Sequence, residues 1–196
     1  MSELRLDARP RRVGVGRAAF VMGLLLLALW GLEVVDQSNG NSLDAYGIRP
    51  RTDEGLVSIF WAPWLHGGWA HLVSNSVPFF VLGLLVLLEG WRAWSWATLV
   101  TVVVSGGLVW LVSPPASLTL GASGVVFGWL TYLLARGLWS RSPAQIAIGA
   151  VVLFVYGGVL WGVLPGAAGV SWQGHLGGAA GGLLAARLLH AGRPPR

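Results

Sequence analysis

Two long stretches without charged side chains limit what this chain can fold into. Residues 93–135 and 142–186, runs of 43 and 45 residues, contain no Asp, Glu, Lys or Arg. A single helix of that length would extend roughly 65 Å, about twice the hydrocarbon thickness of a bilayer. Each run therefore has to turn once, and Pro114-Pro115 and Pro165 mark the turns because proline cannot continue a helix. The two runs predict two pairs of membrane-spanning helices.

The whole pattern predicts an all-α, polytopic membrane protein with six transmembrane helices. Two further apolar stretches precede the uncharged runs. We expect spans at about residues 18–35, 71–88, 94–113, 122–139, 144–164 and 174–190. Only 11% of the residues are charged, less than half of the share of about 25% in soluble domains. This composition excludes an ordinary soluble domain and a disordered chain.

The arginines predict which side of the membrane each terminus occupies. All 13 basic residues are Arg. With six spans, 11 of them fall in the two terminal segments and in the second and fourth connections, whereas Arg49 and Arg51 lie in the first outer loop. Since Lys and Arg concentrate on the cytoplasmic side, both termini are expected there. The predicted divisions are a cytoplasmic N-terminal arm (1–17), a membrane domain (18–190) and a cytoplasmic C-terminal tail (191–196).

Composition also indicates partners and location. The Arg residues form no stripe interleaved with aromatic side chains, so nucleic acid is not expected to bind. The lipid bilayer is the expected environment. Basic residues that are exclusively Arg, together with many Ala and Gly, favour a bacterial source with a high-GC genome, and hence the bacterial plasma membrane.

Strongly polar side chains inside the predicted spans are few and lie at one depth. His71 and Asn75 begin the second span, Ser123 the fourth and His175 the sixth. Even-numbered spans run from outside to inside, so these side chains can meet in one outward-facing cavity. Polar groups within spans are costly and often functional. Each also has an ordinary explanation: a lone Ser usually bonds its own helix backbone, and a His or Asn near a helix end is commonly interfacial.

Ser123 and His175 are the candidate nucleophile and general base. Serine needs a base to become nucleophilic, and His is the common one. No carboxylate is available to complete a triad, because all eight acidic residues lie in tails, loops or span ends. The chain has no Lys or Cys, no His-Glu-x-x-His motif and no paired intramembrane aspartates, so no metal or cofactor is expected. Asn75, His71 and the Ser123 amide carry donors suited to an oxyanion.

Glycines at helical spacing explain how two helices could bring such a pair together. They are Gly124 and Gly128 in the fourth span and Gly178 and Gly182 in the sixth. Small residues let helix backbones approach closely, although the same spacing is usual in helix packing without catalysis. Phe127, one turn after the serine, is placed to pack against the imidazole.

Three motifs occur in order on the predicted second, fourth and sixth spans. They are His66-Gly-Gly-Trp-Ala-His71-Leu-Val-Ser-Asn75, then Gly121-Ala122-Ser123-Gly124, then His175 with Gly178 and Gly182. Over residues 18–190 the chain therefore resembles the rhomboid family of intramembrane serine proteases. In many members a Trp-Arg pair stands in the first outer loop where this chain has Val57-Ser58, and a Tyr stands at Phe127.

The resemblance implies the basic six-helix fold and a Ser123–His175 dyad. It implies an oxyanion hole formed by the Ser123 amide, Asn75 and His71, in an active site open to the extracytoplasmic side. Supporting roles are implied for His66, Gly121, Gly124, Phe127, Gly178 and Gly182. The expected substrates are membrane proteins with one or few spans, cut within or near a transmembrane segment.

Two other functions compete with proteolysis. A non-catalytic scaffold could use the same fold to bind transmembrane helices, and it predicts that Ser123→Ala has no effect in cells. A small transporter would need polar residues and broken helices at the membrane midplane, and the predicted spans have neither.

Overall fold

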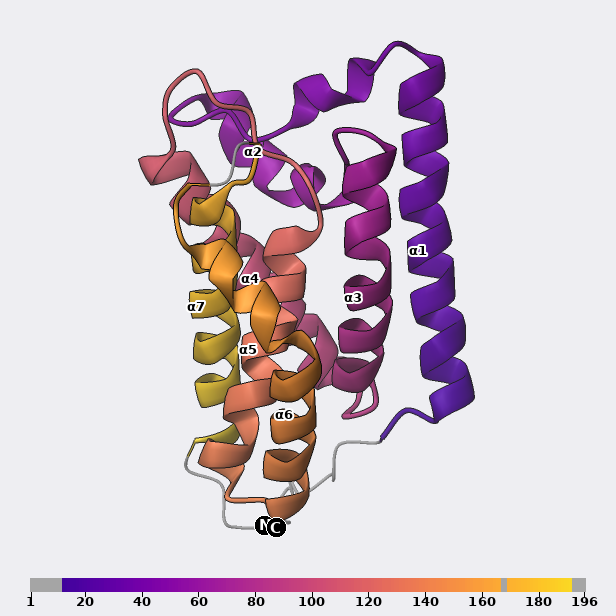
Figure 1. Ribbon diagram of the computed structural model, residues 1–196, viewed down its shortest axis with the longest axis vertical. Helices are drawn as coiled ribbons and strands as arrows, with labels where there is room; N and C mark the ends of the chain where they lie inside the picture. The colour runs from indigo at the N-terminus through magenta and orange to yellow at the C-terminus, as the bar shows by residue number, and fades with distance from the viewer. Residues whose placement is uncertain (1–11, 167–168, 192–196) are drawn as a thin grey trace, which may run out of the picture.

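The structure, a computed structural model, describes residues 12–166 and 169–191, and these residues form a bundle of helices (Figure 1). Their α-helices are α1 (Val15–Ser38), α2 (Asp53–Trp61), α3 (Trp69–Leu87), α4 (Trp91–Val112), α5 (Ser123–Ser140), α6 (Pro143–Tyr156) and α7 (Trp172–His190). Three 3₁₀-helices accompany them: η1 (Ser42–Tyr46), η2 (Ala62–Trp64) and η3 (Gly157–Val163). The expected N-terminal arm and C-terminal tail lie mostly outside the described residues.

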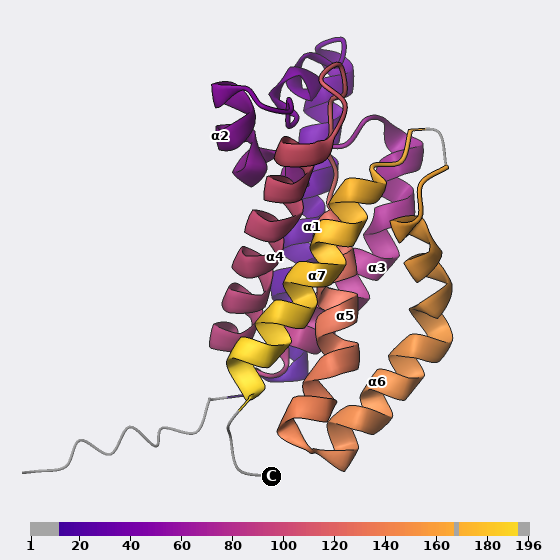
Figure 2. The same cartoon turned by 90° about the vertical axis from the view of Figure 1, so that its left-hand side faces the viewer.

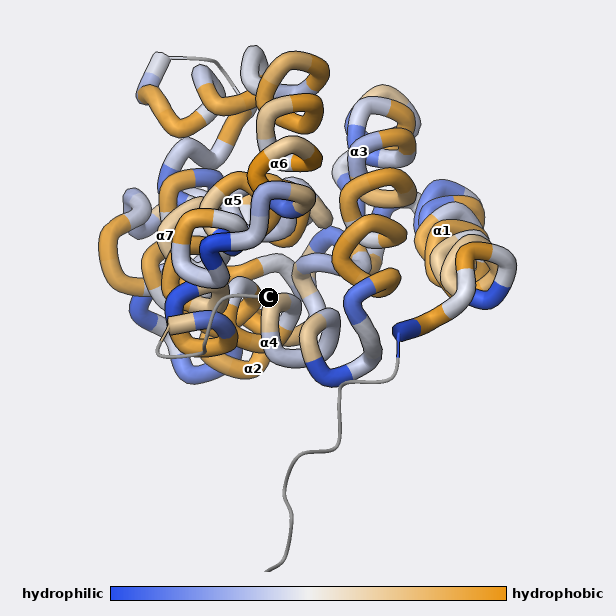
Figure 3. Tube along the Cα trace, turned by 90° about the horizontal axis from the view of Figure 1, so that it is seen from below, coloured by the Kyte–Doolittle hydropathy of each residue, from blue (hydrophilic) through white to orange (hydrophobic). Residues whose placement is uncertain are grey.

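Among the described residues, four helical segments are long and apolar enough to cross a membrane, so the protein is an integral membrane protein. They are Val15–Ser38, Trp69–Leu87, Trp91–Val112 and Pro143–Val163. Figure 3 shows apolar residues over much of α1, α3 and α6. Each of the four corresponds to a predicted span, shifted by three residues or fewer at either end.

The other two predicted spans correspond to α5 and α7, which are less apolar than these four and bury a larger share of their residues against other helices. α5 is buried along most of its length and packs against α3, α4, α6 and α7. Figure 2 shows α7 lying between α4 and α5. Side chains that face other helices need not be as apolar as side chains that face lipid. Six crossings remain a prediction, since length and composition establish four.

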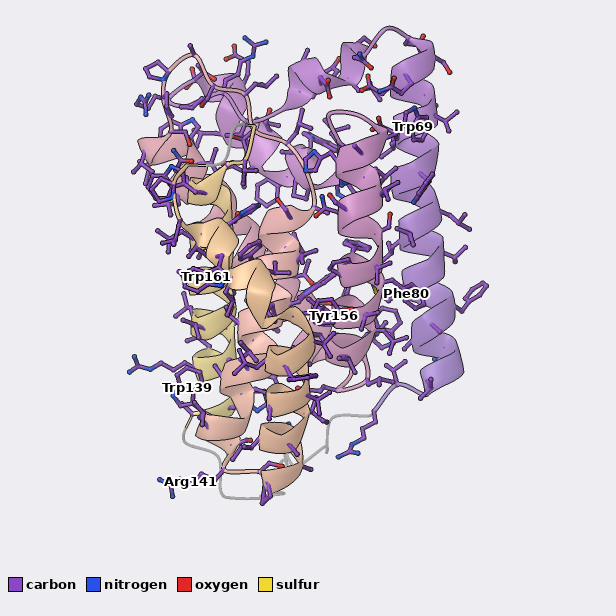
Figure 4. All side chains as sticks on the ribbon, viewed as in Figure 1. Trp69, Phe80, Trp139, Arg141, Tyr156 and Trp161 are labelled. Carbon is purple, nitrogen blue, oxygen red and sulfur yellow. The ribbon has the colours of Figure 1, made fainter. Side chains whose placement is uncertain are left out.

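The ends of the bundle differ in what they carry. In Figure 1 the start of α1 and the end of α7 lie at one end, and α2 lies at the other. Figure 4 shows Trp69 near the α2 end and Trp139 and Arg141 at the opposite end. The even-numbered predicted spans, α3, α5 and α7, therefore all begin toward the end that carries α2.

The first loop is anchored on α4 through groups other than the Trp-Arg pair of many rhomboids. Arg51 donates from Nη1 to the Leu111 carbonyl and from Nη2 to the Ser113 carbonyl, both over 2.9 Å. These carbonyls belong to the C-terminal end of α4, where helical acceptors lack an intrahelical donor. Trp110 Nε1 donates to the Thr52 carbonyl over 2.8 Å. Two side chains from different elements thus fasten the loop to α4.

Arg136 lies within α5, whereas the sequence predicts this residue in the cytoplasmic connection between the fourth and fifth spans. It is buried, with 2% of its surface exposed, and forms an ion pair with Glu89. The Tyr132 hydroxyl donates to Glu89 Oε2 over 2.7 Å and is 2.9 Å from Nε2 of His190. A buried charge is tolerated where a partner and further hydrogen bonds compensate it. α5 therefore continues past the arginine to Ser140.

Candidate active site

Ser123 and His175 lie in hydrogen-bonding contact at the start of two neighbouring helices. Ser123 is the first residue of α5, and His175 lies in the first turn of α7. Nε2 of His175 is 2.9 Å from Oγ of Ser123. The two residues are 52 positions apart in the chain, so packing of α5 on α7 brings them together.

Glycines set the close approach of α5 and α7. A Cβ on Gly178 would strike the Gly124 backbone, and a Cβ on Gly182 would strike the Gly128 backbone. Neither obstacle is a flexible side chain that could move aside. Gly178 and Gly182 therefore let α7 approach the α5 backbone more closely than any larger residue would allow. Gly124 and Gly128 face α4 instead, where a Cβ would strike the Ser105 and Thr101 side chains.

Two hydroxyl groups tie α7 to its neighbours beside the glycine contact. Ser105 in α4 donates to the Gly174 carbonyl over 2.7 Å, and Thr131 in α5 donates to the Ala179 carbonyl over 2.8 Å. Neither residue was among the predicted site residues. Serine and threonine are common in membrane helices, and nothing in their spacing shows which carbonyl they reach.

The imidazole of His175 is held at its other nitrogen and on one face. Nδ1 is 2.9 Å from the Gly162 carbonyl oxygen in η3. A carbonyl can only accept, so Nδ1 carries the proton, and Nε2 of the neutral ring is left to accept from the Ser123 hydroxyl. The Phe127 ring stacks on the imidazole with centroids 4.2 Å apart and planes inclined by 10°.

The candidate oxyanion donors line one cavity together with the serine. Ser123 opens α5, so its N–H is one of the amides that lack an intrahelical acceptor. Asn75 is buried, and its Nδ2 donates one hydrogen to the His71 carbonyl over 3.0 Å, which leaves the second N–H of the amide. Asn75 and His71 line the same cavity as Ser123.

The segment before Ser123 is shaped by Gly121 and His66. Gly121 has φ of +123°, and a Cβ there would lie 2.6 Å from the His71 ring. The Ala122 N–H donates to Nε2 of His66 over 3.4 Å. Burial, together with the neighbouring His71, lowers the pKa of His66 to about 4, which keeps Nε2 free to accept. His66 and His71 meet edge to face, with ring centroids 5.1 Å apart.

A cavity of about 790 Å³ joins these groups. The side chains of His71, Asn75, Ser123 and His175 line it, with Phe127 and Val159 forming apolar parts of the wall. Among the described residues, no three His, Asp or Glu side chains come together in positions to hold a metal ion. The cavity brings together a hydroxyl that is hydrogen-bonded to an imidazole and several further hydrogen-bond donors.

Comparisons with known proteins identify the family. The profile of the Rhomboid domain matches residues 53–192. An uncharacterized protein of Mycobacterium tuberculosis is 45% identical over 191 residues, which cover 93% of this chain and 78% of that protein. An uncharacterized protein of Mycobacterium leprae is 43% identical, with 93% and 75% covered. Rhomboid-like protease 5 of Toxoplasma gondii is 35% identical over 147 residues, 70% of this chain and 17% of that protein. Because the profile spans most of its length, this chain belongs to the rhomboid family.

Proposed function

We propose that this protein is an intramembrane serine endopeptidase that cleaves membrane proteins within or near a transmembrane segment. The hydrogen bond of 2.9 Å between His175 Nε2 and Ser123 Oγ is the observation that carries the proposal. Membership of the rhomboid family supports the same activity. In this proposal Ser123 is the nucleophile and His175 the general base.

The first half of the reaction acylates the enzyme. As Ser123 Oγ attacks the scissile carbonyl carbon, its proton moves to Nε2 of His175. The tetrahedral intermediate then collapses: its C–N bond breaks, and the proton on Nε2 passes to the leaving amine. One product carries the new amino terminus, and the other remains bound to Ser123 as an ester.

Water completes the reaction. Nε2 of His175 takes a proton from a water molecule as the oxygen attacks the ester carbonyl. Collapse of the second tetrahedral intermediate breaks the bond to Oγ and returns the proton to Ser123. In both intermediates the negative oxygen accepts from the Ser123 amide, with Asn75 and His71 as further donors.

The proposed topology puts the reaction at the extracytoplasmic side. The first helix begins, and the last ends, at the end of the bundle opposite α2 (Figure 1). With cytoplasmic termini, the starts of α3, α5 and α7 then face outward, where water can reach the cavity. Substrates are proposed to be membrane proteins that present an extended segment there.

The test is labelling of detergent-purified protein with a fluorophosphonate, which reacts only with an activated serine. The wild type is compared with Ser123→Ala, His175→Ala and, as a control, Ser95→Ala, which changes an exposed serine at the start of α4. We expect labelling of the wild type and of Ser95→Ala, and none of the other two.

Cleavage in lipid completes the test. Wild-type protein in proteoliposomes should cut a single-span reporter substrate, and Ser123→Ala should not. A folded wild type that neither labels nor cuts would contradict the protease proposal and favour the binding scaffold.

A further inference from the structure

We infer that the backbone carbonyl of Gly162 positions His175, taking the place of the carboxylate that orients the base in a catalytic triad. The inference rests on the proposed protease activity, and it adds η3 to the parts of the protein on which that activity depends. It makes Gly162 a positioning residue, because its carbonyl acts on the reaction only through the imidazole.

The Gly162 carbonyl is the group that accepts a hydrogen bond from Nδ1 of His175 and so orients the imidazole. In the part of the chain that the structure describes, no acidic side chain hydrogen-bonds to His175. Glu89, the acidic residue between α3 and α4, pairs instead with Arg136 in α5. An acceptor at Nδ1 selects the tautomer whose Nε2 takes the serine proton, which is what the aspartate of a triad does.

Position 162 suits this role because it has no side chain. A Cβ on Gly162 would lie 2.9 Å from Cζ of Phe127 and 3.1 Å from Nδ1 of His175. Any larger residue would therefore push η3 away from the imidazole or move the stacked Phe127. Glycine lets the carbonyl and the aromatic ring hold the imidazole from two directions at once.

The element that carries this carbonyl is packed differently from the helix before it. α6 is held on α5 over its first half, where Gly149 lies against the Leu133 and Leu134 carbonyls and Ile146 lies against Gly137. After Tyr156 the helix tightens into 3₁₀ form at Gly157, a change that often marks a hinge.

The outer face of η3 is open. Trp161 is 75% exposed, and Figure 4 shows it on the α7 side of this segment. The inner face of η3 contacts α7, and Val159 and Leu160 pack against the hydrophobic core. A displacement of η3 would break the Nδ1 hydrogen bond, so the base is correctly oriented only while η3 is docked.

An amide-to-ester replacement tests the carbonyl itself. Val163 is replaced by its α-hydroxy acid through nonsense suppression, which turns the Gly162 carbonyl into an ester carbonyl, a weaker acceptor. We expect the rate of fluorophosphonate labelling to fall about five- to tenfold, as weakening one hydrogen bond predicts. In ¹⁵N-histidine NMR spectra, the His175 signal should lose its strong preference for the Nδ1-protonated tautomer.

The matched control is an ester one residue later, in which the α-hydroxy acid of leucine replaces Leu164. It weakens the Val163 carbonyl and removes the Leu164 N–H, which donates to the Trp161 carbonyl over 3.1 Å, and it leaves the Gly162 carbonyl as an amide. We expect this variant to keep the His175 tautomer and nearly all of the labelling rate. Equal labelling and equal NMR spectra for wild type and the Val163 ester would overturn the inference.

A second pair of variants covers the case in which the ester protein does not fold. Gly162→Ala pushes η3 off the imidazole, whereas a Cβ on Gly158, in the same helix, meets no atom within 4 Å. We expect Gly162→Ala to label at least about fivefold more slowly than Gly158→Ala. Equal rates would overturn the inference. Folded wild type that is neither labelled nor able to cut the reporter substrate would instead overturn the proposed function, so the two failures are distinguishable.

Discussion

At the scale of single residues, the segment before Ser123 depends on a backbone conformation that side chains disfavour. Gly121 has φ of +123°, and its N–H donates to the Ala62 carbonyl over 2.8 Å. Its α-carbon also faces the His71 ring at a distance that leaves no room for a Cβ. The positive φ and the close His71 ring therefore both restrict position 121, two residues before α5 begins at Ser123.

Gly121→Ala should therefore damage the site twice, through backbone strain of about 1–3 kcal/mol and through displacement of His71. We expect fluorophosphonate labelling to fall by at least about tenfold, since small misplacements at a catalytic site are costly. Gly67→Ala is the control, because its Cβ would meet only Leu120 at 3.8 Å. Equal labelling of the two variants would show that neither constraint matters.

The lowered pKa of His66 predicts how the stability of the fold depends on pH. The pKa of His66 is lowered from 6.5 to about 4 in the folded protein. Between these pH values the unfolded chain binds the extra proton, so the free energy of unfolding decreases as pH falls from 6.5 to 4. This difference in pKa between the folded and unfolded chain corresponds to a decrease of about 3 kcal/mol in the free energy of unfolding.

The measurement is the thermal unfolding midpoint in detergent at pH 7 and pH 4.5. In His66→Gln the side chain keeps an acceptor for the Ala122 N–H but cannot titrate. We expect the variant to lose less stability on acidification than the wild type. Identical losses would assign the pH dependence to other groups.

At the scale of elements, the α5–α7 contact decides whether Ser123 and His175 meet. Their hydrogen bond requires the two helices to touch backbone to backbone, as Gly178 does against Gly124. The chemistry therefore depends on residues that carry no functional group.

Gly178→Val should separate α5 from α7 and abolish labelling while Ser123 and His175 remain present. The thermal midpoint should also fall, because a core overpacked by a side chain usually costs about 1–3 kcal/mol. Gly107→Val is the matched control on α4, since a Cβ there meets no atom within 4 Å. Labelling of Gly178→Val at the wild-type rate would contradict this account of the helix contact.

Substitution of Arg51 tests whether its hydrogen bonds anchor the first loop on α4. Arg51→Ala removes both hydrogen bonds to the end of α4 and should lower the free energy of unfolding by about 1–2 kcal/mol. Arg49→Ala makes the same change in charge in the same exposed segment. A larger fall in thermal midpoint for Arg51→Ala than for Arg49→Ala is the expected result, and equal midpoints would contradict the anchoring role.

At the scale of the whole molecule, the distribution of Arg residues predicts a topology that chemical labelling can measure. The chain has no Cys, so single-cysteine variants report one site each. Ala116, between α4 and α5, and Arg92, near the start of α4, are both exposed and lie at opposite ends of that helix.

In intact bacterial cells, Ala116→Cys should react with a membrane-impermeant thiol reagent, and Arg92→Cys should react only after permeabilisation. The reverse pattern would place the site on the cytoplasmic side and overturn the predicted orientation, while leaving the dyad untouched.

The sequence by itself determined most of the helix boundaries. A bilayer forces every spanning segment to satisfy its own backbone hydrogen bonds, so apolar length and proline positions indicate where each helix lies. The motifs around Ser123 and His175 followed from residue types, because few polar side chains occur in an apolar span. Apolar length, proline positions and short motifs are all properties of short segments. Each can therefore be recognised without knowing how distant parts of the chain pack.

Only the tertiary structure decided how the site is held. The Gly162 carbonyl meets His175 across 13 residues, and Arg51 meets the end of α4 across 60. The ion pair that lets α5 continue through Arg136 likewise joins two different segments. Every residue carries a carbonyl, so no sequence pattern distinguishes the one that accepts from a given side chain. That choice depends on distances between helices, which exist only once the bundle has packed.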